Sequence, residues 1–156
     1  MGEKMMKSKV FNVEIAGLKL PFEFYTFDYI DTDLKKIFSE EQVKTYDMSI
    51  WRKWSQIRKD KCEGTEFFTY IKFFVDKETN ITYALIGGKT NYNSPDISLH
   101  DVIENERRIG RLFMTSDKYK MSNMILVVHH EKASEDSLQA TFIERYVQRK
   151  YNLFDS

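Results

Sequence analysis

Two apolar segments separated by a short polar stretch constrain the fold of this chain most. They occupy residues 67–75 and 81–86, read FFTYIKFFV and ITYALI, and flank DKETN. Runs rich in aromatic and β-branched residues, bounded by turn-forming residues, are typical of strands joined as a β-hairpin. The second run is followed by Gly87-Gly88-Lys89-Thr90. Flexible glycines beside a cation and a hydroxyl suit a close approach to a phosphate.

The remainder of the C-terminal half predicts a β-β-α-β-α order. Ser98 is typical of a helix N-cap, and the apolar run 121–128 is too short for a helix and favours a central strand. Residues 137–150 predict an amphipathic helix. We expect its buried side to consist of Leu138, Phe142, Ile143, Tyr146 and Val147.

The N-terminal part predicts strands followed by helices. Residues 10–30 favour two short strands, or one strand with a bend, and Asp31-Thr32 resembles a helix start. Helical spacing of apolar residues continues to Val43. The predicted fold class is α+β, with a small central antiparallel sheet flanked by helices. The predicted organisation is an N-terminal β/α extension over residues 1–65 and a second unit over residues 66–156.

The charge balance excludes a uniformly basic surface, because the chain has 24 Lys and Arg residues and an equal number, 24, of Asp and Glu residues. A local basic face remains compatible with that balance. Residues 49–61 predict a helix whose cations are Arg52, Lys53, Arg58, Lys59 and Lys61. Such a face is either simply solvated or, in a nucleic-acid-binding protein, the place where phosphates bind.

A single cysteine, Cys62, cannot form an internal disulfide, which favours a reducing compartment. No apolar run has the length of a membrane span, so we expect no membrane partner and a cytoplasmic location.

Several residues of the C-terminal half stand in a recognisable order. Tyr70 lies in the first strand, Gly88, Lys89 and Thr90 follow the second, and Arg111 falls on the next helix, with Arg107 and Arg108 as alternatives. Glu144 lies on the last helix, and Asn152 follows that helix. This order resembles the GIY-YIG nuclease domain over residues 67–154, although Ile86 stands where the second motif has a tyrosine.

The resemblance implies an endonuclease that cleaves DNA, encoded by a phage or another mobile element. Tyr70 would act as general base or position the water, and Lys89 would supply a point charge. Arg111 would hold the scissile phosphate, and Glu144 would bind one Mg²⁺, or else Mn²⁺. Substrate contacts would come from Gly88, Thr90, Arg107, Arg108, Asn152 and the basic helix.

Each of these residues also has a purely structural explanation. Tyr70 suits a half-buried strand position, the three arginines suit a solvated helix face, and Glu144 suits a surface position. Asn152 suits a helix C-cap. The alternative hypothesis is therefore a catalytically silent module of the same fold that recognises DNA, RNA or a protein partner, and Ile86 favours it. The sequence leaves the oligomeric state open.

Overall fold

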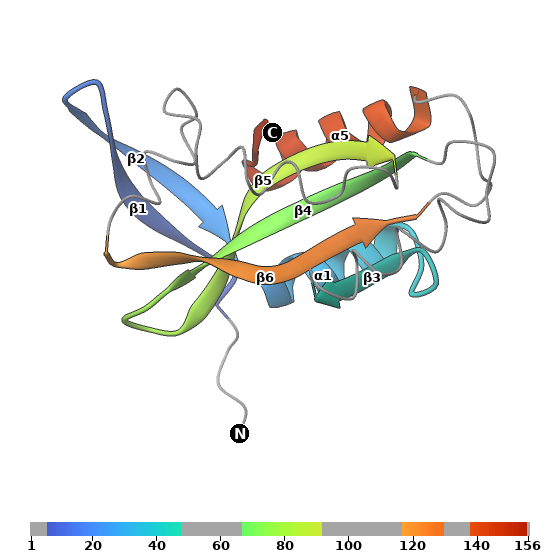
Figure 1. Ribbon diagram of the computed structural model, residues 1–156, viewed down its shortest axis with the longest axis horizontal. Helices are drawn as coiled ribbons and strands as arrows, with labels where there is room; N and C mark the ends of the chain where they lie inside the picture. The colour runs from blue at the N-terminus through green and yellow to red at the C-terminus, as the bar shows by residue number, and fades with distance from the viewer. Residues whose placement is uncertain (1–5, 48–66, 92–116, 130–137, 156) are drawn as a thin grey trace.

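The structure is a computed structural model that describes residues 6–47, 67–91, 117–129 and 138–155 (Figure 1). It has an α+β fold, as predicted. The elements are β1 (Ser8–Ile15), β2 (Leu18–Tyr25), α1 (Phe27–Ile37), β3 (Val43–Asp47), β4 (Phe67–Asp76), β5 (Ile81–Asn91), β6 (Tyr119–Val128), α5 (Leu138–Tyr151) and β7 (Phe154–Asp155).

A five-stranded sheet in the order β3-β6-β4-β5-β7 forms the centre of the molecule. Strand β4 pairs in antiparallel fashion with β5 on one side and β6 on the other, and its register with both shifts just after Lys72. The short strand β7 runs parallel to β5. The sheet is therefore mixed, whereas the sequence predicts an antiparallel one.

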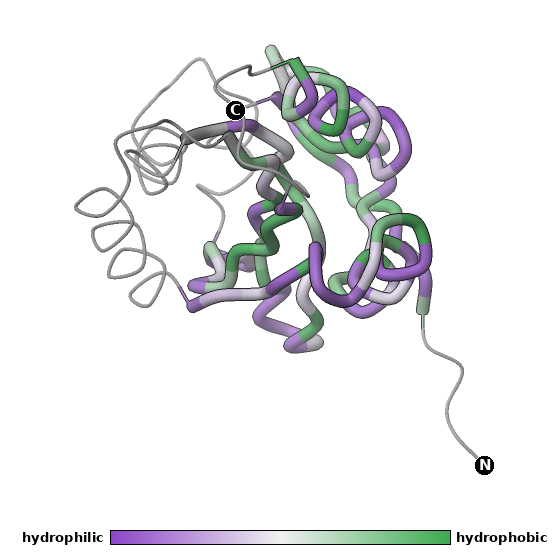
Figure 2. Tube along the Cα trace, turned by 90° about the vertical axis from the view of Figure 1, so that its right-hand side faces the viewer, coloured by the Kyte–Doolittle hydropathy of each residue, from purple (hydrophilic) through white to green (hydrophobic). Residues whose placement is uncertain are grey.

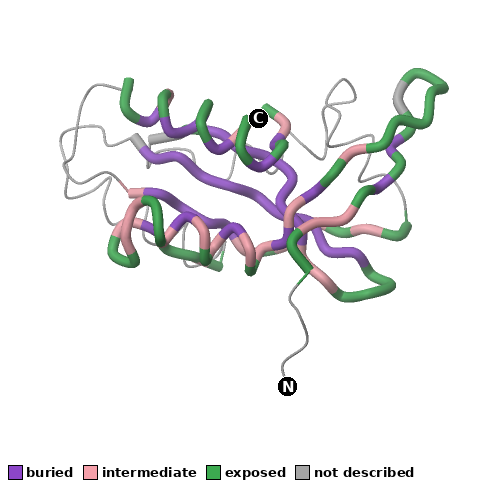
Figure 3. Tube along the Cα trace, turned by 180° about the vertical axis from the view of Figure 1, so that it is seen from behind, coloured by how far each residue is buried: buried purple, intermediate pink, exposed green. Residues whose placement is uncertain are grey.

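Both described helices cover the same face of this sheet, as the view from behind shows (Figure 3). Ile30 and Leu34 of α1 pack in one buried cluster with Ile143 and Val147 of α5 and with residues of β3, β4, β5 and β6. Hydrophobic and hydrophilic residues alternate around the turns of both helices, as expected for helices with one buried side (Figure 2). This shared core fixes α5 against β4 and β5.

The hairpin of β1 and β2 covers one end of the opposite face. Phe11 packs edge-on against Phe74 of β4 and Tyr83 of β5, with ring centroids 5.7 and 5.0 Å apart. The hairpin turns at Ala16-Gly17, where φ is 51° and 79°. Positive φ at both central residues is the geometry of a two-residue turn that matches strand twist, and glycine adopts it without strain.

The structure corrects three boundaries expected from the sequence. Strand β5 continues through both glycines to Asn91 rather than ending at Ile86. Helix α1 starts at Phe27 because the Thr26 side chain caps it by accepting from the Tyr29 N–H. Val43 starts a strand, since β3 finds its partner in β6.

The N-terminal part contributes to the same sheet and the same core as the C-terminal part. Strand β3 pairs with β6, and α1 shares its buried cluster with α5. The predicted boundary at residue 65 and the basic helix 49–61 lie outside the described residues, as does the helix predicted from Ser98. Neither α1 nor α5 combines the length and the apolar character needed to cross a membrane.

Candidate functional site

Tyr70 lies on the face of the sheet that points away from α5. Its neighbour Thr69 points toward α5, because the Thr69 hydroxyl donates to the Ala140 carbonyl at 2.9 Å. Side chains alternate along a strand, so Tyr70 faces the other way. It is only 2% exposed, and the Nζ atom of Lys72, which is also buried, lies 5.7 Å from its ring centroid. Tyr70 is thus a buried strand residue.

Lys89 and Glu144 come together on the α5 side of the sheet. Lys89 pairs with Thr69 across the β4–β5 ladder and therefore shares its face. The Lys89 side chain donates to Thr141 Oγ1 at 2.5 Å, and its backbone N–H donates to the Glu144 carboxylate. Of the four residues expected to be catalytic, these two lie side by side, while the sheet separates Tyr70 from Glu144.

Glu144 is a buried carboxylate rather than a surface one, with 6% of the residue exposed. Burial raises its pKa above the usual value, and the nearby charge of Asp155 raises it further, while Lys89 and Arg145 act in the opposite direction. Two neighbouring carboxylates are oxygen donors of the kind that Mg²⁺ accepts, but Mg²⁺ also keeps several of its waters. The burial of Glu144 disfavours such a hydrated ion. The magnesium site stays a prediction, and the described residues contain no group of three or more His, Cys, Asp or Glu side chains that could hold a metal.

The two glycines of β5 point to opposite faces of the sheet. Gly88 is the ladder partner of Tyr70 and lies on the face away from α5. Gly87 lies beneath α5 and the chain that follows it. A Cβ on Gly87 would come within 2.9 Å of Leu153 Cδ1 and 3.1 Å of Gln148 Cγ. Glycine at this position is explained by the close approach of α5 to β5.

The outer edge of β5 is closed by groups from α5 and the C-terminal segment. Gln148 Nε2 donates to the Gly87 carbonyl at 2.8 Å and to Asp155 Oδ1 at 3.1 Å. Glu144 accepts the N–H of Lys89, two residues further along β5. Strand β7 pairs with β5 only at Ile86 and Gly87, and backbone groups on the edge of a sheet need other partners where no further strand covers them. Glu144 and Gln148 therefore have a structural role.

Asn152 terminates α5. Its φ is 55°, and the next residue, Leu153, donates its N–H to the Gln148 carbonyl at 3.0 Å. This pattern is the Schellman ending of a helix, in which asparagine tolerates the left-handed conformation. The Asn152 side chain donates to the Glu23 carbonyl at 3.4 Å. Asn152 therefore has the role at the C-terminus of a helix that its purely structural explanation predicts.

The other residues expected at the site lie outside the described residues, or have side chains that do. These are Arg52, Lys53, Arg58, Lys59, Arg107, Arg108 and Arg111, together with the side chain of Thr90.

The outer face of α5 carries large side chains that the sequence analysis placed in the core. Phe142 is 76% exposed and Tyr146 is 37% exposed, and Leu138 is exposed as well. The expectation that these three residues are buried is wrong. The buried side is instead formed by Ala140, Ile143, Glu144, Val147 and Tyr151. Positions 140, 143, 144, 147 and 151 follow the spacing of one helix face. The sequence could therefore have indicated this buried side, because the same face cannot also hold Leu138, Phe142 and Tyr146.

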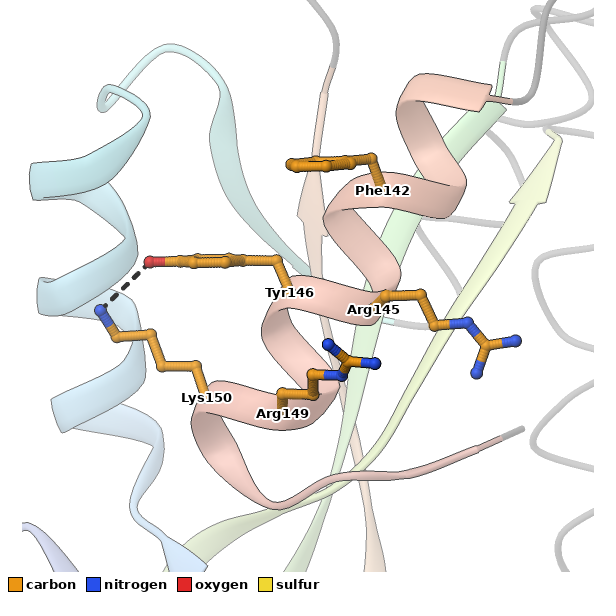
Figure 4. A pocket seen from close by; sticks show the side chains of 5 residues that line it. All are labelled: Phe142, Arg145, Tyr146, Arg149 and Lys150. Carbon is orange, nitrogen blue, oxygen red and sulfur yellow. Dashed lines mark hydrogen bonds between the residues drawn. The ribbon is translucent and has the colours of Figure 1, made fainter.

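Phe142, Arg145, Tyr146, Arg149 and Lys150 line an open cavity of about 500 Å³ on this outer face (Figure 4). The Phe142 and Tyr146 side chains extend to the side of α5 nearer α1, Arg145 extends to the other side, and Arg149 lies across the helix between them. We call these five residues the α5 face.

A chain of polar contacts anchors one end of the α5 face to α1. Lys150 Nζ donates to Tyr146 Oη at 3.3 Å and lies 3.2 Å from Asp33 Oδ2. Asp33 also accepts from the hydroxyl of the buried Tyr151 at 2.6 Å. The bond to Tyr146 contributes most to the raised pKa of Lys150, so this amine is charged at neutral pH.

The α5 face is electropositive. Helix α5 carries three basic residues and one acidic residue, Glu144, which is buried on the opposite side. Asp33 already pairs with Lys150. Within the described ranges, neither Arg145 nor Arg149 forms an ion pair. Arg145 donates to Gln148 Oε1 at 3.5 Å, and because neither guanidinium group is held in an ion pair, both can take an anionic ligand.

No family model matches this sequence, and no curated protein or solved structure matches it either.

Proposed function

We propose that this chain is a nucleic-acid-binding module that does not cleave its ligand, and that the α5 face is its contact surface. The observation that carries the proposal is the combination of Arg145, Arg149 and Lys150 with two exposed aromatic rings on one helix face. Cations of this kind attract phosphates, and exposed rings offer surfaces to bases. The zero net charge of the chain is compatible with such a local patch.

The arrangement of the expected catalytic residues supports binding over cleavage. Hydrolysis requires the base and the metal ligand to reach one phosphate at the same time. Tyr70 is buried on the face of the sheet opposite α5, whereas Glu144 lies on the sheet-facing side of α5 and accepts a backbone N–H. The silent module suggested by Ile86 is therefore the function that this geometry favours.

Binding is tested with the Arg145→Ala/Arg149→Ala double variant and a labelled mixed-sequence oligonucleotide. Affinity is measured by fluorescence anisotropy over a series of salt concentrations. Removing two phosphate contacts should weaken binding at low salt and reduce the slope of log K against log salt by about 1.5. The matched control, Lys19→Ala/Lys44→Ala, removes the same charge from exposed positions on β2 and β3.

Equal losses in the two double variants would show that net charge alone drives binding, and would overturn the assignment to α5. In the same series, plasmid DNA incubated with the protein and Mg²⁺ or Mn²⁺ should stay supercoiled. Cleavage that disappears in Glu144→Ala would contradict the proposal and support the endonuclease expected from the sequence.

A further inference from the structure

We infer that the α5 face takes single-stranded nucleic acid, with successive bases stacked on Phe142 and Tyr146. This inference rests on the proposed function and names the class of ligand for the same surface. It starts from the exposure of Phe142, which is 76% accessible although it lies in the middle of an ordered helix. A ring so exposed has a free surface available to a flat, apolar ligand.

The spacing of the two rings favours a single strand over a duplex. Phe142 and Tyr146 are four residues apart, which separates them by about 6 Å along the helix axis. Both extend to the same side of α5 (Figure 4). Bases in a duplex stack about 3.4 Å apart and expose their faces only at the ends. A single strand can open between bases and present a face to each ring.

Tyr146 is held in position before any ligand arrives. Lys150 Nζ donates to the Tyr146 hydroxyl, and the same amine pairs with Asp33 on α1. Asp33 is also held by Tyr151, which is fully buried. A ring fixed in this way loses less freedom on binding than a mobile one. The contacts thus preorganise one of the two stacking positions.

Arg145 and Arg149 lie where the sugar-phosphate backbone of a strand with its bases stacked on the two rings would run. Arg145 and Arg149 are also about one helical turn apart; Arg145 extends to the side of α5 away from the rings, and Arg149 lies between Arg145 and the rings (Figure 4). This arrangement places the rings along one border of the α5 face and the two guanidinium groups directly beside them, where the phosphates of a bound strand would lie. It is the combination of stacking surface and cationic track by which proteins hold single strands.

The test compares a mixed-sequence single strand with the blunt duplex of the same sequence, each labelled and titrated with the full chain at low salt. We expect the single strand to bind about tenfold more tightly or better. Phe142→Ala should weaken single-strand binding about tenfold and leave duplex binding nearly unchanged. Phe142→Trp should preserve single-strand binding, because it keeps a stacking surface. The matched control is Leu18→Ala, which removes an exposed apolar side chain from β2.

The outcomes separate this inference from the proposed function. If both ligands bind equally and Phe142→Ala has no effect, while the double arginine variant weakens both, the single-strand inference fails and nucleic-acid binding stands. If neither ligand binds at low salt, both proposals fail and a protein partner becomes the explanation for the α5 face. If Leu18→Ala weakens binding as much as Phe142→Ala, the assignment to stacking is overturned.

Discussion

Glu144 has the most informative environment of any single residue in the described structure. The sequence resemblance assigns it to a metal, yet its carboxylate is buried on the sheet-facing side of α5, accepts the Lys89 N–H and has a raised pKa. A carboxyl group whose pKa is raised by burial is accommodated better neutral than charged. Its ionisation therefore reduces the stability of the fold.

The first prediction is that Glu144→Gln removes a pH-dependent loss of stability. Because the folded pKa lies above the ordinary value of 4.5, the free energy of unfolding should fall as pH rises from about 4.5 through the folded pKa. Glutamine keeps an acceptor for the Lys89 N–H and carries no charge. The variant should be at least as stable as the parent at pH 7, and its stability should be flat in that window.

Denaturant titration at a series of pH values measures this effect. Asp33 serves as an internal reference because its shift has the opposite sign. Burial alone would raise its pKa, but the hydrogen bonds from Tyr151 and Lys150 outweigh burial and lower it. The stability that the ionised Asp33 carboxylate gives the fold is therefore lost only as pH falls below about 3.8. A Glu144→Gln profile identical to the parent's would contradict the prediction.

At the scale of elements, the contact between α5 and β5 depends on a glycine. Gly87 allows Leu153 and Gln148 to lie directly against the strand. We predict that Gly87→Ala lowers the free energy of unfolding by about 1–3 kcal/mol, the usual cost of overpacking. Chemical denaturation of the variant measures the change.

The cause of that loss can be isolated with a double-mutant cycle. Leu153→Ala makes room for the new methyl group, so its effect should be non-additive with Gly87→Ala. The control is Gly17→Ala, whose new Cβ would meet nothing within 4 Å and whose cost comes from a φ of 79°. Its effect should add to that of Leu153→Ala. Additivity in both pairs would refute the packing explanation.

The sequence predicts the elements with strong local patterns and misses those that depend on distant partners. The apolar runs of β4, β5 and β6 and the periodicity of α5 identify those elements. Strand β3 is missed because it is defined by pairing with β6, far along the chain. The glycines of β5 suggest a strand exit, but Gly87 lies within the strand, where Leu153 and Gln148 leave no room for a Cβ.

The candidate site is less predictable for the same reason. The sequence cannot say on which face of β4 a residue lies relative to α5, so it groups Tyr70 with Glu144. It also cannot choose between two apolar sets on α5, and so it buries Phe142 and Tyr146. Both questions are decided by which side of α5 meets the sheet.

At the scale of the whole molecule, one sheet and one core unite residues from both predicted parts. A fragment of residues 66–156 would lack β3, which covers β6, and α1, which contributes Ile30 and Leu34 to the core. We predict that this fragment does not unfold cooperatively on its own, because it leaves apolar surface and a strand edge exposed.

Circular dichroism during thermal unfolding and amide chemical-shift dispersion in NMR spectra measure this property. The full chain is the control, and a fragment of residues 6–156 should retain the cooperative transition. A cooperative transition in the 66–156 fragment would support an independent unit beginning near residue 66.

The closed edge of β5 has a consequence for how this protein behaves at high concentration. Thr26 forms a single bridge to Tyr83, β7 pairs with Ile86 and Gly87, and α5 side chains reach the backbone at Gly87 and Lys89. A strand with its outer groups occupied in this way is a poor template for the addition of another chain. Helix α5 thus offers its outer face to a ligand, while Glu144 and Gln148 on its inner side keep this edge of the sheet from recruiting other copies of the chain.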